Sequence, residues 1–134
     1  MFFKDVTGQE KIKARLISFV REQRISHALM FTGPEGTGKL ALALAFAQYV
    51  SCRNRNEADS CGVCPSCRKY QKLVHPDLHF VFPVYSTKDL KKPVSDDYLS
   101  AWREMVKVNP YFTLSQWLAF IKSENKQGLI YESE

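Results

Sequence analysis

The stretch Gly33-Pro34-Glu35-Gly36-Thr37-Gly38-Lys39-Leu40 decides how this chain is expected to fold. It has the spacing, both glycines and the lysine of a phosphate-binding loop, G-x-x-x-x-G-K-[ST]. In such a loop, backbone N–H groups and the dipole of the following helix hold phosphate oxygens, and the lysine reaches the β- and γ-phosphates. Leu40 replaces the hydroxyl residue that would hold Mg²⁺. All eight residues are therefore candidates for binding ATP or ADP, with Mg²⁺ binding disfavoured by Leu40.

The flanking sequence agrees with this interpretation. Residues 28–32, Ala-Leu-Met-Phe-Thr, form a short apolar run typical of a buried parallel strand. Residues 38–51 are rich in alanine and leucine and predict a helix that is apolar nearly all round. A second buried strand is expected at 79–84. The prediction is an α/β fold with parallel strands flanked by helices; the alternative for the loop is a glycine-rich turn without a ligand.

All four cysteines, Cys52, Cys61, Cys64 and Cys67, fall within sixteen residues. Two overlapping C-x-x-C steps occur at 61–64 and 64–67, where Gly62 and Pro65 allow tight turns. Four thiolates around Zn²⁺ make a closed structural site without a catalytic position. The four cysteines are thus predicted to be ligands of a structural zinc ion. Metal binding would also order the polar loop 53–60.

Other uses of the cysteines stay open. An iron–sulfur cluster also uses C-x-x-C-x-x-C, but the usual fourth cysteine three residues later is absent, since Arg68 to Tyr70 fill that stretch. Disulfides are disfavoured if the compartment is reducing. Free structural cysteines are a further alternative, although they rarely cluster so tightly.

Composition bounds the remaining classes. The 134 residues are enough for one domain with a core, and 45% apolar and 25% charged residues are ordinary for a globular protein. The net charge of +5 mildly favours acidic partners such as nucleic acid. No apolar stretch approaches a membrane span, and the first residues do not resemble a secretory signal. A cytoplasmic location without membrane contact is expected.

Helix-start signals occur at three places. Thr7-Gly8-Gln9-Glu10 and Thr113-Leu114-Ser115-Gln116 both read as capping boxes. Residues 95–97 are expected to cap a helix that runs to Val108, and another helix is expected from about Cys64 to Val74. The predicted cores of the later helices contain Trp102 and Trp117.

Together these features resemble one family. Val6-Thr7-Gly8-Gln9-Glu10, the run from Arg24 into the phosphate loop, the four cysteines and His75-Pro76-Asp77 are similar to the N-terminal part of the bacterial DNA polymerase III clamp-loader subunits, gamma/tau and delta-prime. The resemblance implies an AAA+ core with an inserted zinc module. The resemblance also implies that Val6, Gly8 and His27 lie near the nucleotide base. It covers residues 2 to about 84.

The resemblance implies a layout and shows two departures. Residues 1–84 would be the N-terminal part of an AAA+ domain with the zinc module at 52–67, 85–127 a helical insertion, and 128–134 the start of the next strand, with the remainder of the domain absent. Leu40 is similar to delta-prime, whereas gamma/tau carries threonine there. No apolar run ends in the Asp-Glu pair that an AAA+ ATPase needs.

The expected function follows from the resemblance. A delta-prime-like chain would help to assemble the hetero-oligomeric clamp-loader ring of DNA polymerase III holoenzyme, which loads the sliding clamp onto primed DNA, without hydrolysing ATP itself. One alternative is a gamma/tau-like ATP-hydrolysing motor. Another is a zinc-dependent nucleic-acid-binding module that uses the basic residues near the cysteines: Arg53, Arg55, Arg68, Lys69 and Lys72.

Overall fold

The computed structural model describes residues 1–122 and 127–131 and divides into two compact units, Met1–Leu78 (unit 1) and His79–Glu134 (unit 2). Among the described residues, none of the helices has the length and apolar content needed to span a lipid bilayer. The phosphate loop and all four cysteines belong to unit 1. The layout expected at 1–84, 85–127 and 128–134 stays a prediction, although the compact units divide after Leu78.

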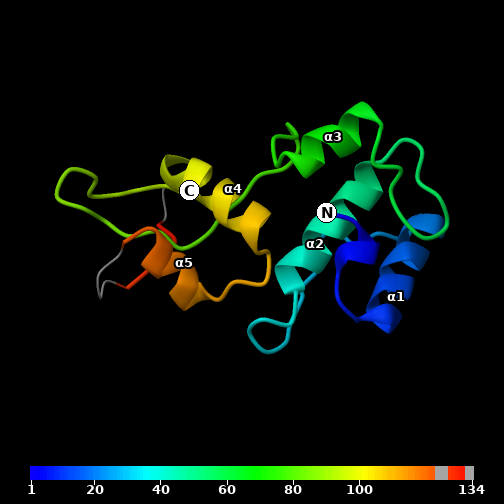
Figure 1. Ribbon diagram of the computed structural model, residues 1–134, viewed down its shortest axis with the longest axis horizontal. Coiled ribbons are helices and arrows are strands. Elements are labelled where there is room, and N and C mark those ends of the chain that lie inside the picture. The colour runs from blue at the N-terminus through cyan, green and yellow to red at the C-terminus, as the bar shows by residue number, and fades with distance from the viewer. Residues whose placement is uncertain (123–126, 132–134) are drawn as a thin grey trace. The chain divides into compact units, whose positions relative to one another are not determined.

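Unit 1 is built around one apolar helix. Its elements are η1 (Phe3–Asp5), α1 (Glu10–Arg21), α2 (Lys39–Ser51) and α3 (Pro65–Gln71) (Figure 1). Helix α2 packs against η1, α1 and α3. None of its thirteen residues is exposed, which confirms the prediction of a helix buried on several sides from its alanine- and leucine-rich sequence. Seven residues are buried: Ala41, Leu42, Leu44, Ala45, Phe46, Gln48 and Tyr49.

Helix α1 begins differently from the prediction. The capping box expected at Thr7 and Glu10 is wrong, because the N-cap is Gln9, in the left-handed region with φ 63°, and its side chain makes no capping hydrogen bond. The start of the helix is held instead by Lys13, whose buried ammonium donates to the Val6 carbonyl at 2.6 Å and to Glu10 Oε1 at 2.9 Å.

The two predicted strands, 28–32 and 79–84, are wrong. Across residues 1–122 and 127–131 the only bridge pairs Val84 with Leu129, so the described part of the chain is partly helical and has no parallel sheet. A strand needs a neighbour for its backbone groups, and the two segments belong to different units. Leu29 and Met30 are 38% and 88% exposed, so the first segment has no covering layer.

Unit 2 has its own aromatic core. Its elements are η2 (Ser95–Tyr98), α4 (Leu99–Val108) and α5 (Leu114–Phe120). The Phe82 ring stacks on Trp102, with centroids 4.1 Å apart, and meets Trp117 edge-on at 5.2 Å. Trp117 is fully buried and donates from Nε1 to the Pro83 carbonyl at 2.8 Å. Both tryptophans are thus core residues.

The sequence signals for the unit 2 helices are confirmed in part. The capping box at Thr113 and Gln116 is confirmed, because the Thr113 hydroxyl accepts from Gln116 N and the Gln116 side chain accepts from Thr113 N. The helix expected to end at Val108 ends there, but its predicted cap at 95–97 is wrong, because these residues belong to the 3-10 helix η2 and α4 begins at Leu99 with Tyr98 as its N-cap. The strand expected from residue 128 is seen only as two backbone hydrogen bonds between Val84 and Leu129, of 2.9 and 2.8 Å; residues 132–134 lie outside the described part.

Candidate metal centre and phosphate loop

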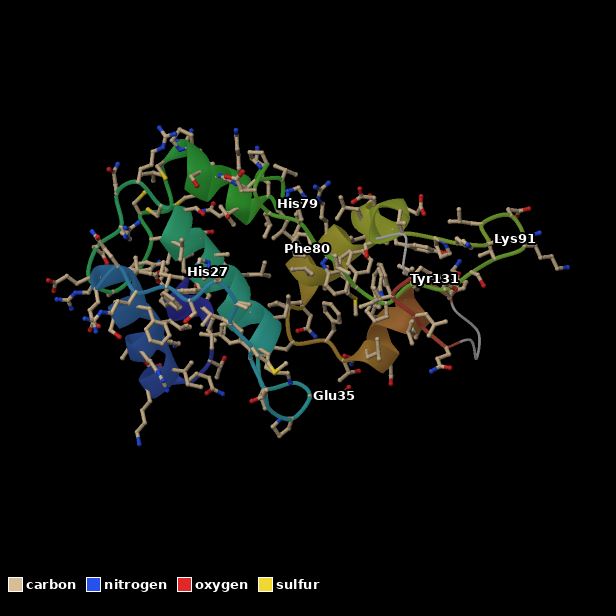
Figure 2. All side chains as sticks on the ribbon, turned by 180° about the vertical axis from the view of Figure 1, so that it is seen from behind. His27, Glu35, His79, Phe80, Lys91 and Tyr131 are labelled. Atoms are coloured by element: carbon tan, nitrogen blue, oxygen red, sulfur yellow. The ribbon has the colours of Figure 1, made fainter. Side chains whose placement is uncertain are left out.

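The phosphate loop, residues 33–40, is shaped by three glycines. Gly33, Gly36 and Gly38 have φ values of 149°, 73° and 82°, which glycine reaches with little strain. The Thr37 hydroxyl donates to the Pro34 carbonyl at 2.8 Å and closes the turn. Figure 2 shows Glu35 at the tip of this loop, away from the helices of unit 1. The loop therefore forms an exposed turn that leads directly into α2.

Lys39 lies at the point where the loop becomes a helix. Its ammonium donates to the Gly33 carbonyl at 2.8 Å and also to the Pro34 carbonyl. The first N–H groups of a helix have no partner within it, and the helix dipole places partial positive charge there. The loop thus joins a lysine ammonium to the positive end of α2, an arrangement suited to an anion. Leu40 is half-buried and brings no oxygen for a metal ion.

A pocket of about 400 Å³ adjoins the loop. This volume falls within the range of small-molecule sites. Its walls come from α1, from the unpaired segment 29–32 and from the start of α2, and they include Ile12, Phe19 and Leu42. Gln9 lines it as well, but Val6, Gly8 and His27, which the resemblance directs towards a nucleotide base, do not. The pocket is mainly apolar, with Lys39 and Arg15 as its cationic groups.

The four cysteines come together as predicted from their spacing. Their sulfur atoms all lie within 4.8 Å of one another, and the thiols are free rather than paired in disulfides. Cys52 follows α2, Cys61 lies in the connecting loop, Cys64 is the N-cap of α3 and Cys67 lies in its first turn. In a tetrahedral ZnS₄ site the sulfurs stand about 3.8 Å apart, given a Zn–S distance of about 2.3 Å. The residues present therefore fit a zinc-sized ion.

Backbone donors surround the sulfurs. Cys61 N donates to Cys52 Sγ at 3.2 Å, Cys64 N to Cys61 Sγ at 3.4 Å, and Cys67 N to Cys64 Sγ at 3.4 Å. The N–H groups of Cys67 and Arg53 lower the pKa of Cys64 to about 6. Burial, opposed in part by backbone donors, raises the pKa of Cys67 to about 12. Burial also raises the pKa of Cys52. The cluster thus contains thiols poised on both sides of neutral pH.

Sequence reasoning missed the residues that support this cluster. The Asp59 carboxylate accepts from the backbone N–H groups of Phe3, Lys4 and Ser60 at 3.2, 3.0 and 2.8 Å, respectively. Gln48, fully buried on α2, donates to the Ser60 hydroxyl at 2.7 Å. A signal for Gln48 was present, because it is the one amide in an otherwise apolar helix sequence. Nothing in the sequence distinguishes Asp59 from other loop carboxylates.

The basic residues near the cysteines differ in role. Arg55 is tied down: its guanidinium donates to the carbonyls of Val50 and Cys52 at 3.1 and 3.0 Å and lies over the Tyr49 ring. Three cations at α3 are exposed and have no ion pair or hydrogen bond from their side chains within the described part of the chain: Arg68, Lys69 and Lys72. His75 stacks on Tyr70 and contacts Ser66, and it is not one of the clustered ligands.

Comparison with known proteins places these features in a family. The profile described as "DNA polymerase III, delta subunit" matches residues 8–128, which include the phosphate loop and the four cysteines. The chain is 37% identical over 75 residues to DNA polymerase III subunit delta' of Bacillus subtilis, covering 56% of this chain and 22% of the relative.

Tau subunits match as well. Identity is 39% over 66 residues with DNA polymerase III subunit tau of Bacillus subtilis (49% of this chain, 12% of the relative) and 34% over 93 residues with that of Escherichia coli (66% and 14%). The chain thus spans 12% to 22% of the length of these three relatives. No solved structure matches it. The resemblance drawn from the motifs is confirmed: the chain belongs to the DNA polymerase III delta subunit family, among the subunits of the gamma/tau and delta-prime type.

Proposed function

We propose that this chain is the nucleotide-binding part of a delta-prime-like clamp-loader subunit that holds ATP or ADP without hydrolysing it. The observation that carries the proposal is the pair Lys39-Leu40 at the start of α2, within the stretch that the family profile matches. Lys39 and the helix N-terminus supply positive charge for phosphates. Leu40 supplies no oxygen for Mg²⁺, which carries much of the charge neutralisation in phosphoryl transfer.

The cysteines have a structural role in this proposal. Cys52, Cys61, Cys64 and Cys67 would hold Zn²⁺, which fixes the end of α2 to the start of α3. A tetrathiolate site has no open coordination position, so it supports the fold rather than chemistry. The partners of the whole protein would be the other clamp-loader subunits and, through the complex, the sliding clamp and primed DNA in the cytoplasm.

The gamma/tau-like motor is the competing assignment, because both kinds of relative match the chain. ATP turnover separates the two. Phosphate release would be measured with Mg²⁺ for the whole protein and for its Lys39→Ala variant, alongside binding of a fluorescent ATP analogue. We expect the analogue to bind, and Lys39→Ala to weaken its affinity at least about tenfold, because one charge-assisted contact is lost. We expect no phosphate release above the buffer rate. Mg²⁺-dependent release that Lys39→Ala abolishes would establish the motor instead.

A second function, nucleic-acid binding by the cysteine module, is favoured by the exposed cations Arg68, Lys69 and Lys72. Binding to phosphates through such residues falls steeply with salt. DNA binding would be measured at two salt concentrations for the chain and for the variant with all three changed to alanine. The matched control replaces three exposed lysines of unit 2, Lys88, Lys91 and Lys92, of which Lys91 points outward in Figure 2. Loss of binding only in the α3 variant supports this function, and no binding at low salt removes it.

A further inference from the structure

The first residues of the chain are bound to the loop between Cys52 and Cys61, residues 53–60 (the metal loop). One carboxylate makes the junction: Asp59 Oδ1 accepts from Phe3 N at 3.2 Å, and Asp59 Oδ2 accepts from Lys4 N at 3.0 Å. Asp59 Oδ1 also accepts from Ser60 N at 2.8 Å. Asp59 therefore connects the chain start to the residue that directly precedes Cys61.

A buried amide makes a second junction. Gln48 Oε1 accepts from the Met1 ammonium at 3.2 Å, and Gln48 Nε2 donates to the Ser60 hydroxyl at 2.7 Å. Because Gln48 is fully buried, both of its polar atoms depend on these partners. The chain start and the metal loop are thus satisfied by the same side chain of α2.

Ring contacts complete the attachment. Gly62, between Cys61 and Cys64, has φ 76°, and a Cβ there would come within 2.7 Å of the Phe2 ring. The buried Phe3 ring lies 5.5 Å from the Tyr49 ring, and the Tyr49 hydroxyl donates to the Asn56 carbonyl at 2.9 Å. The chain start therefore packs against the C-x-x-C turn and against Tyr49, which in turn hydrogen-bonds the middle of the metal loop.

We propose that metal binding by the four cysteines holds residues 1–6 in place, and that Asp59 is the positioning residue that transmits this. The proposal rests on the metal site proposed above. Without a metal ion, hydrogen bonds such as those from Cys61 N to Cys52 Sγ and from Gln48 to Ser60 are left to hold the metal loop. These bonds alone must offset the conformational entropy that the polar loop loses when it becomes ordered. Asp59 then loses its fixed position, and with it the backbone groups of Phe3 and Lys4 lose their acceptor.

The segment continues into the wall of the phosphate-loop pocket. The carbonyl of Val6 accepts from Lys13 of α1, and the N-cap Gln9 and the α1 residues Ile12 and Phe19 line that pocket. Metal occupancy thus acts on a wall of the pocket through residues 1–6, although no cysteine lines it.

Hydrogen exchange tests the proposal. Exchange of the Phe3 and Lys4 amides would be followed in the zinc-loaded chain and after chelation, with zinc content determined on the same samples and the Leu44 and Ala45 amides of α2 as internal reference. We expect protection at Phe3 and Lys4 to fall about tenfold or more on zinc removal while α2 stays protected. Unchanged protection after proven zinc loss overturns the proposal, as does equal loss in α2.

A variant pair separates Asp59 from the metal itself. In zinc-loaded Asp59→Ala we expect one zinc per chain but unprotected Phe3 and Lys4 amides. Glu57→Ala, an exposed carboxylate of the same loop, is the matched control and should keep both zinc and protection. Protected amides in Asp59→Ala would overturn the positioning role. A chain that binds no zinc at all would overturn the metal site itself, an outcome read directly from the metal content.

Discussion

Leu40 is the second residue of α2 and follows Lys39, the lysine of the phosphate-loop pattern. Its side chain is a branched alkyl group. The missing group there is a single hydroxyl, so the effect of restoring it can be isolated. In Leu40→Thr we expect nucleotide binding to become Mg²⁺-dependent, because the new oxygen can ligate the ion beside the phosphates. Affinity for ATP should rise about tenfold or more on adding Mg²⁺, the effect of one charge-assisted contact.

Fluorescence titration with and without Mg²⁺ measures this effect, and Leu40→Val, which removes bulk without adding oxygen, is the control. Equal Mg²⁺ dependence in Leu40→Thr and in the parent chain would mean that another residue already holds the ion.

The cysteine pKa values give the metal site a definite pH dependence. At pH 7 to 8 the Cys67 thiol, with its pKa raised to about 12 by burial, is protonated, and Cys52 is shifted in the same direction. Cys64, with a pKa lowered to about 6 by backbone donors, is already a thiolate. Zinc binding therefore releases protons from Cys52 and Cys67, so zinc affinity must rise with pH. With at least these two protons released, the rise is at least about 100-fold per pH unit.

Competition with a chelator of known pH-dependent affinity, at three values between pH 7 and 8, measures the slope. A slope near zero would contradict protonated thiols at this site. Below about pH 6 the slope should steepen, because Cys64 then also takes up a proton.

At the scale of elements, the features that the sequence predicted correctly depend on residues close together in the chain. The box at Thr113 and Gln116 forms because both partners lie within one helical turn. The apolar character of α2 predicted burial on several sides, and none of its residues is exposed. The C-x-x-C spacing predicted that Cys61, Cys64 and Cys67 come together for the same reason, since each step is one short turn, whereas Cys52 joins them from the end of α2.

Predictions were wrong where the structure depends on contacts between residues far apart in the sequence. The run at 28–32 has strand-like composition, but a strand forms only against a neighbour, and none lies beside it in the described residues. The box at Thr7 failed because the buried Lys13 ammonium, which binds the Val6 carbonyl, holds the entry to α1 by a tertiary contact. Asp59 could not be singled out because its partners, Phe3 and Lys4, lie at the other end of unit 1's sequence.

Helix α5 is attached to unit 2 mainly through Trp117. This side chain is fully buried, contacts Phe82 and Trp102, and donates to the Pro83 carbonyl. Trp117→Ala should therefore lower the free energy of unfolding of unit 2 by about 3–5 kcal/mol, the usual cost of an aromatic-to-alanine cavity. Urea unfolding followed by circular dichroism measures the loss.

Leu114, on the same helix and 46% exposed, provides the comparison. Leu114→Ala should change the free energy of unfolding by about 0.5 kcal/mol or less, as substitutions on the surface do. Similar losses in both variants would mean that α5 is held by its whole length rather than by the tryptophan.

For the whole molecule, the family is shown by the match over residues 8–128, while the nucleotide and metal sites are proposals supported by geometry. Unit 1 brings the two candidate sites to opposite ends of one helix: the phosphate loop precedes α2 and Cys52 follows it. In this arrangement a structural metal would support the same helix whose N-terminus is proposed to bind the phosphates. The central claim is that the loop binds nucleotide without using Mg²⁺.

Calorimetric titration of ATP into the zinc-loaded chain, with and without Mg²⁺, tests that claim most directly. The account predicts saturable binding at one site per chain, with the same affinity in both conditions and no phosphate released. Absence of binding at millimolar ATP, or binding that strengthens with Mg²⁺ and is followed by phosphate release, would contradict it.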